Sequence, residues 1–235
     1  MDVAHFHEVT ANLWPERPPP VGWVRVSTIP AGVPMWDGPA TSACQFWREG
    51  TRRVFAMGPE HGSCPVGRLT MGFEAQPSAE RSVIDFMEEI GYIDPVELAS
   101  LPTIPAGHSA IVYGPLRDLP IEPEAVLLLA DAAQLMLLGE ASGLARLDRP
   151  GVTLTGRPTC AAIPAALREA ELRGSFACVG ARIYADLGPG ELLAVIPAAR
   201  ADAIAAGLER TAAANRRLAE VHTAAKRELA RSVPD

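Results

Sequence analysis

The chain has 235 residues, a formal net charge of −7, 48% hydrophobic residues and 21% charged residues. This composition is typical of a globular protein with a sizeable core, and the acidic balance argues against nucleic acid or an anionic membrane as a partner. The N-terminus lacks a basic segment followed by an apolar one, and no apolar run is long enough to cross a bilayer. We therefore expect a cytoplasmic protein whose cysteines stay reduced.

Helical and extended patterns alternate through the first half of the chain. Residues 1–40 are rich in proline and include an expected strand at residues 23–26. Further along, apolar spacing and caps predict a short helix from Cys44 with Ser42 as its N-cap, a strand at 53–56, a helix opened by Cys64, helices at 79–91 and 95–101, and a strand at 108–113.

The second half repeats this alternation. Residues 125–130 are continuously apolar, which predicts a central strand covered on both faces, and Asp131 then caps a helix to about residue 141. We expect a strand at 152–154, a helix over 158–172 interrupted at Pro164, a buried strand at 192–196, and a long alanine-rich helix from residue 198 to residue 232. Such alternation favours an α/β or α+β fold with a mixed sheet.

The expected organisation is one domain built from two related halves. We assign residues 1–40 to a proline-rich N-terminal segment, residues 41–197 to the core domain and residues 198–235 to the C-terminal helix. That helix carries Leu208, Leu218 and Val221 on one side, so it either packs along the domain or serves as a homodimer or partner surface.

Four cysteines fall into two matched pairs. Cys44 precedes an expected helix, and Cys64-Pro-Val-Gly-Arg68 follows after a short strand; Cys160 and Cys178-Val-Gly-Ala-Arg182 repeat that pattern. The repetition indicates an internal duplication, which would bring the four sulfurs towards a pseudo-twofold axis. The helix starts and the two arginines favour ionised sulfur, and thiolates are strong ligands for soft metals.

The first hypothesis is therefore a metalloprotein whose ligands are Cys44, Cys64, Cys160 and Cys178. Zinc knuckles with closely spaced cysteines are missing, whereas a [4Fe–4S] iron–sulfur cluster accepts ligands from distant segments. Such a site would perform redox or Lewis-acid chemistry on a small-molecule substrate or serve a redox partner. For each cysteine taken singly, burial as a small apolar side chain is the competing interpretation.

Two other function classes stay open. The Cys64-Pro65 pair resembles the Cys-Pro pair that ligates haem in some proteins, which gives a haem protein with Cys64 or His61 as axial ligand. A non-enzymatic sensor or interaction protein with buried structural cysteines is the third. Dinucleotide, nucleotide and zinc-protease motifs are missing from the sequence. Whether the chain is an enzyme is left open.

Several residues near the cysteines are secondary candidates. Gln45 would support a ligand sulfur, and Gly67 and Gly180 would let the backbone approach a cofactor. The candidates for catalysis are His61, Tyr113, Arg68 and Arg182. Each also has a structural interpretation, such as a loop histidine or a packed tyrosine.

Five motifs carry a family resemblance over about residues 40 to 200. They are Cys44-Gln45 followed by Gly50, His61-x-x-Cys64-Pro-x-Gly67 with Met71-Gly72, Val112-Tyr-Gly-Pro-Leu116, Ala125-Val-Leu-Leu with Gln134-x-Met136, and Cys178-x-Gly-x-Arg182 with Glu191-Leu and Ile196-Pro197. In these the chain resembles the bacterial and archaeal domain-of-unknown-function family 169, whose pattern also has a cysteine at Cys160. It departs at Ala177, where the family more often has glycine. The resemblance implies the fold and the cysteine positions, but no activity.

Overall fold

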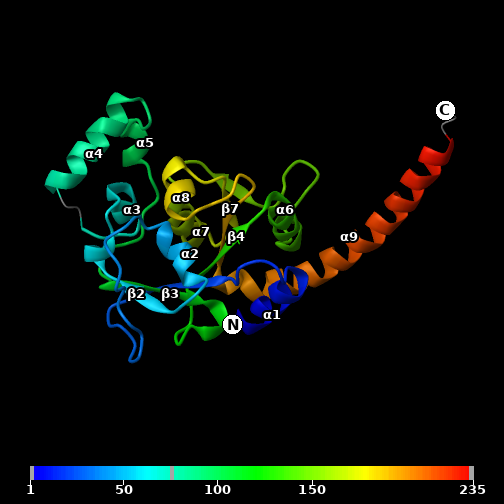
Figure 1. Ribbon diagram of the computed structural model, residues 1–235, viewed down its shortest axis with the longest axis horizontal. Helices are drawn as coiled ribbons and strands as arrows, with labels where there is room; N and C mark the ends of the chain where they lie inside the picture. Colours follow the sequence, from blue (N-terminus) through cyan, green and yellow to red (C-terminus); the bar gives the residue numbers. More distant parts are fainter. Residues whose placement is uncertain (1–2, 75–76, 233–235) are drawn as a thin grey trace.

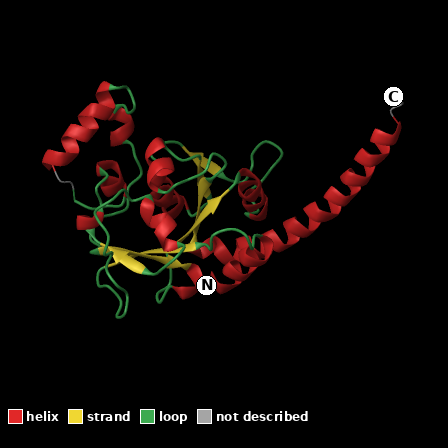
Figure 2. Cartoon of the chain, in the orientation of Figure 1, coloured by secondary structure: helices red, strands yellow, loops and turns green. Residues whose placement is uncertain are grey.

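The computed structural model describes residues 3–74 and 77–232. Figure 1 shows a central sheet with helices on both of its faces and a long C-terminal helix that leaves the body of the molecule. The N-terminal helix lies beside the first part of that long helix, and the colouring in Figure 2 separates the sheet from the surrounding helices.

The sheet has seven strands in the order β2-β3-β1-β4-β7-β6-β5. All neighbouring pairs are antiparallel except β5 and β6, so the predicted mixed sheet is confirmed. The strands are β1 (Val21–Val26), β2 (Phe55–Met57), β3 (Ala110–Pro115), β4 (Ala125–Ala130), β5 (Thr153–Thr155), β6 (Arg173–Ser175) and β7 (Leu192–Pro197).

The predicted duplication is visible in the strand order. The first half contributes β2-β3-β1 and the second half contributes β4-β7-β6, so the two sets mirror each other about the β1–β4 junction. The register agrees, because Val21 stands opposite Pro115 in one half and Ala125 stands opposite Pro197 in the other.

The junction itself obeys the same symmetry. Strands β1 and β4 pair with Val21 opposite Leu127 and Trp23 opposite Ala125, on either side of the Gly22–Val126 pair. A pseudo-twofold axis therefore passes between β1 and β4. The predicted N-terminal segment, residues 1–40, contains one of these two central strands, and the division of the chain into domains stays a prediction.

Equivalent short helices follow equivalent strands in the two halves. Helix α2 (Gln45–Gly50) corresponds to α7 (Ala162–Glu169), and α3 (Pro65–Thr70) corresponds to α8 (Val179–Tyr184). The 3₁₀ turns η1 (Pro59–His61), η2 (Leu116–Asp118) and η3 (Thr159–Ala161) lie between the larger elements. Pro164 does not interrupt α7 as predicted, because it lies in the first turn, where backbone N–H groups have no partner within the helix.

Each half also carries its own insertion. In the first half, α4 (Pro77–Glu89) and α5 (Pro95–Ala99) form a helical hairpin between α3 and β3. In the second half, α6 (Ala132–Ala141) and β5 come between β4 and α7. Figure 1 shows the α4–α5 hairpin standing at one end of the molecule, beside α3.

Two apolar layers cover the sheet. The large aromatic side chains Trp23, Trp47, Phe46, Phe55 and Tyr113 lie on one face with α2 and α7. On the other face, α1 (Val3–Leu13), α6 and the first part of α9 (Ala198–Ser232) pack together. Residues of β4 alternate between the two layers, so the prediction of a strand covered on both faces is confirmed.

The end of α9 lies outside this packing. From Arg216 to Leu229 every side chain is exposed, whereas Ala201, Ile204 and Leu208 are buried. The predicted long C-terminal helix is confirmed. Within the described ranges, no helix combines the length and the apolar character that a membrane span needs.

Candidate functional site: an apolar pocket lined by the four cysteines

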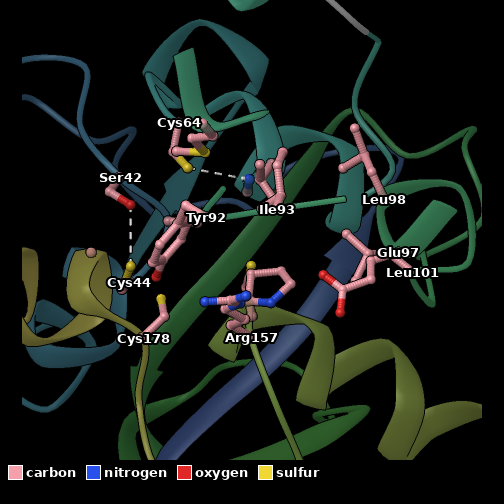
Figure 3. A pocket seen from close by; sticks show the side chains of 17 residues that line it. Ser42, Cys44, Cys64, Tyr92, Ile93, Glu97, Leu98, Leu101, Arg157 and Cys178 are labelled. Atoms are coloured by element: carbon pink, nitrogen blue, oxygen red, sulfur yellow. Dashed lines mark hydrogen bonds between the residues drawn. The ribbon is translucent and has the colours of Figure 1, made fainter. Parts of the chain in front are cut away.

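A pocket lies where the two halves and the α4–α5 hairpin meet, and all four cysteines line it (Figure 3). Its empty space amounts to about 730 Å³ when the part that is open to solvent is included. Its other lining residues are Ser42, Ala43, Val66 and Gly67 from the first half, Met87, Tyr92, Ile93, Glu97, Leu98 and Leu101 from the hairpin region, and Arg157, Pro158 and Gly180 from the second half.

The cysteines occupy equivalent positions in the two halves. Cys64 is the N-cap residue of α3 and Cys178 is the N-cap residue of α8, and both are partly exposed. The Cys64 Sγ accepts a hydrogen bond from the Gly67 amide at 3.4 Å. Cys44 immediately precedes α2 and Cys160 lies in η3, just before α7, and both are buried.

The two buried cysteines have hydroxyl partners. Ser42 Oγ lies 3.1 Å from Cys44 Sγ, and Thr70 of the first half donates to Cys160 Sγ of the second half at 3.1 Å. Burial raises the pKa of Cys44 to about 12, and burial raises the pKa of Cys160 well above its ordinary value. These two groups are therefore thiols at neutral pH, contrary to the predicted thiolates.

The prediction of a metalloprotein is wrong. Among the residues that the structure describes, no group of three or more histidine, cysteine, aspartate or glutamate side chains is placed so that it could hold a metal ion. The sulfurs lie along the walls of one pocket without forming a ligand group, and two of them are protonated and bonded to hydroxyls. Iron–sulfur and metal-binding functions are therefore not supported, and the haem alternative has no support either.

The secondary candidates divide between the pocket and its surroundings. Gly67 and Gly180 line the pocket. Gln45 instead accepts a hydrogen bond from Thr41 Oγ1 at 2.5 Å. The space around the two glycines differs. A Cβ at Gly67 would lie 3.2 Å from Ala43, whereas a Cβ at Gly180 would meet only Cys178 Sγ, at 4.0 Å.

The four candidates for catalysis have structural contacts outside the lining of the pocket. His61 accepts from the Gly58 amide at 3.0 Å and closes its own turn. Arg68 donates to the carbonyls of Pro59 and Glu74, and Arg182 donates to those of Gly188 and Phe176. The two arginines are thus equivalent in the two halves, and each hydrogen-bonds to loop carbonyls on both sides of its own helix.

Tyr113 belongs to the aromatic layer beneath the pocket. It is fully buried, and its ring stacks on Phe55 with 5.6 Å between the ring centroids. Burial raises its pKa above the ordinary range. A catalytic role for Tyr113, His61, Arg68 or Arg182 stays a prediction.

The sequence did not single out the hairpin residues that complete the pocket. Tyr92 reaches into it from the segment between α4 and α5, and Arg157 reaches in from the second half (Figure 3). The guanidinium carbon of Arg157 lies 4.7 Å from the centroid of the Tyr92 ring. No spacing in the sequence shows that the hairpin folds back over the cysteines, since this contact is purely tertiary.

Comparison with known proteins identifies one family. A family model described as "Uncharacterised ArCR", DUF169, matches residues 17–207, which includes both halves of the sheet. The chain belongs to the DUF169 family. This match confirms the predicted resemblance, whereas the four-cysteine pattern of DUF169 stays a prediction. No curated protein and no solved structure matches the chain.

Proposed function

We propose that the protein binds a small, largely apolar molecule in the pocket between its two halves. The observation that carries this proposal is the lining itself, in which aliphatic, aromatic and thiol groups greatly outnumber charged ones. Ligand sites in proteins are typically concave and mostly apolar, with few polar groups that orient the ligand. The protonated Cys44 and Cys160 belong to the apolar surface of such a site.

The α4–α5 hairpin supports the same proposal. It supplies about a third of the lining, yet none of its side chains from Val83 to Leu101 is buried. An element held by few buried contacts opens at low cost in free energy, as ligand-covering segments generally do. The hairpin is therefore proposed as the cover through which the ligand enters.

The test is a titration with the neutral dye Nile red, whose fluorescence increases in apolar surroundings. In Gly180→Leu the added side chain enters free space of the pocket from a helical position, so the fold should persist while dye binding falls by at least about tenfold. The control is Gly190→Leu, where a Cβ meets nothing within 4 Å and which lies outside the pocket lining. Equal dye binding by Gly180→Leu and the wild type would exclude the pocket.

Two broader proposals accompany this function. We propose a cytoplasmic location and a small-molecule partner in place of nucleic acid, which the net charge of −7 supports. We also propose homodimerisation through the end of α9. Support comes from Leu218 and Val221, which lie one turn apart with 53% and 64% of their surfaces exposed.

A further inference from the structure

The pocket contains two charged side chains among its described lining residues, Arg157 and Glu97. They come from different parts of the chain, since Arg157 precedes η3 in the second half and Glu97 lies in α5 of the hairpin. Both are exposed, which places their charged groups at the open side of the pocket. Figure 3 shows Arg157 between Cys178 and Glu97 in this view, with Cys44 and Glu97 on opposite sides of it.

Arg157 differs from the other arginines around the site in the hydrogen bonding of its guanidinium. Arg48 is engaged with Glu191 and two carbonyls, and Arg68 and Arg182 are engaged with loop carbonyls. Arg157 stacks on Tyr92, and no hydrogen bond or ion pair of its guanidinium occurs within the described part of the chain. Stacking holds the plane of the guanidinium while its N–H edge stays available.

We propose that the ligand carries a carboxylate that pairs with Arg157, while its apolar body lies against the cysteine-lined wall. This inference rests on the proposed ligand-binding function and names the class of ligand. A guanidinium presents its N–H groups in a fork that matches the two oxygens of a carboxylate. Glu97 carries the opposite charge on the hairpin, so it opposes an anionic ligand and favours a cationic one.

The experiment is displacement of Nile red from the full-length protein by octanoate, methyl octanoate and octylamine, which share a chain and differ in charge. We expect octanoate to displace the dye at lower concentration than octylamine. Arg157→Gln should weaken the binding of octanoate by about tenfold, as expected for the loss of a charged hydrogen-bonded pair. The same variant should leave the binding of methyl octanoate unchanged. Glu97→Gln should strengthen the binding of octanoate, because it removes a negative charge from the lining of the pocket.

The opposite signs of the two variants separate a carboxylate site from a general effect on the fold. Octanoate displacement that is equal in the wild type and Arg157→Gln, or stronger displacement by octylamine than by octanoate, would overturn the carboxylate inference. Nile red binding that remains sensitive to Gly180→Leu would then leave the pocket itself in place. If Gly180→Leu also left dye binding unchanged, the proposed function would fail with it.

Discussion

Arg48 of the first half donates a hydrogen bond to Glu191 of the second half, with 2.9 Å between Nη2 and Oε2. The same guanidinium donates to the carbonyls of Ala185 and Asp186, directly after α8. Burial alone would raise the pKa of Glu191, but the Gly188 amide and Arg48 lower it below its ordinary value. The pair therefore links the two halves of the chain.

Replacement of this carboxylate should destabilise the protein in a pH-dependent way. We expect Glu191→Gln to lower the free energy of unfolding by roughly 1–3 kcal/mol at pH 7. Because the pKa is lowered in the folded state, the stabilisation is present above the ordinary pKa of glutamate and is lost as the pH falls through the folded value. Urea unfolding from pH 7 to pH 3 should show the two proteins converging.

The control for that series is Glu49→Gln, which removes the partner of the largely exposed Arg52. Its effect should stay within about 0.5 kcal/mol, as for other surface ion pairs. A pH-independent difference for Glu191→Gln, or equal losses for both variants, would contradict the assigned role of the Arg48–Glu191 pair.

The four cysteines should separate into two classes on alkylation. Cys64 and Cys178 are partly exposed, whereas Cys44 and Cys160 are buried and protonated. With iodoacetamide at pH 8, mass spectrometry should find Cys64 and Cys178 modified at least about ten times faster than the other two. In guanidinium chloride all four should react alike. Fast modification of Cys44 or Cys160 in the folded protein would contradict their assigned burial.

The buried thiol of Cys44 should make the protein sensitive to alkali. Its pKa is raised in the folded state to about 12, so the unfolded chain releases the proton first and stability falls as the pH rises above the ordinary pKa of 9.0. The slope contributed by this thiol is up to about 1.4 kcal/mol per pH unit. The free energy of unfolding of Cys44→Ala should therefore fall less steeply between pH 9 and pH 11 than that of the wild type. Parallel curves would refute this.

The packing of α9 on α6 depends on a glycine. A Cβ at Gly207 would lie 2.2 Å from the carbonyl oxygen of Ala141, which is backbone and cannot move independently. We expect Gly207→Ala to cost roughly 1–3 kcal/mol despite the better helix propensity of alanine. Gly180→Ala in α8 is the matched control, because its Cβ has room, and it should be neutral or stabilising by up to about 1 kcal/mol. Thermal melts should therefore show a lower melting temperature for Gly207→Ala and an unchanged or higher one for Gly180→Ala.

The end of α9 should control self-association. Leu218→Asp with Val221→Asp places two charges on the proposed dimer surface, and light scattering should then report a monomer where the wild type is a dimer. Thr223→Asp lies on a different side of the same helix and should leave the dimer intact. A monomeric wild type, or a dimer that persists in the double variant, would contradict this surface.

The sequence predicted most of the individual elements because their signals are local. Strand β4 is a continuous apolar run, and Asp131 and Gln134 form the capping box that starts α6. The paired cysteines correctly indicated the duplication. Elements with little local signal were not predicted, such as β6, whose three residues Arg173–Ser175 carry no alternation.

The site was predicted only in part, for a physical reason. The cysteines do line one pocket, but burial raises the pKa of Cys44 and of Cys160, and the hydrogen bonds to Ser42 and Thr70 only partly oppose that effect. Thr70 belongs to the first half of the chain, whereas its partner Cys160 belongs to the second. Spacing alone suggested thiolate metal ligands, whereas Cys44 and Cys160 are thiols and the described residues form no metal-holding group. The contact of Arg157 with Tyr92 joins the second half to an insertion of the first, so nothing in the sequence around either residue predicts it.

The most direct measurement is X-ray diffraction from crystals of the protein exposed to bromobenzene, a small apolar probe of the kind that enters dry cavities. We expect a bromine anomalous peak inside the pocket, within contact distance of Cys178 and Gly180 and beneath Tyr92. A pocket without bromine, with peaks only at exposed apolar side chains of α8 such as Val179 and Ile183, would contradict it.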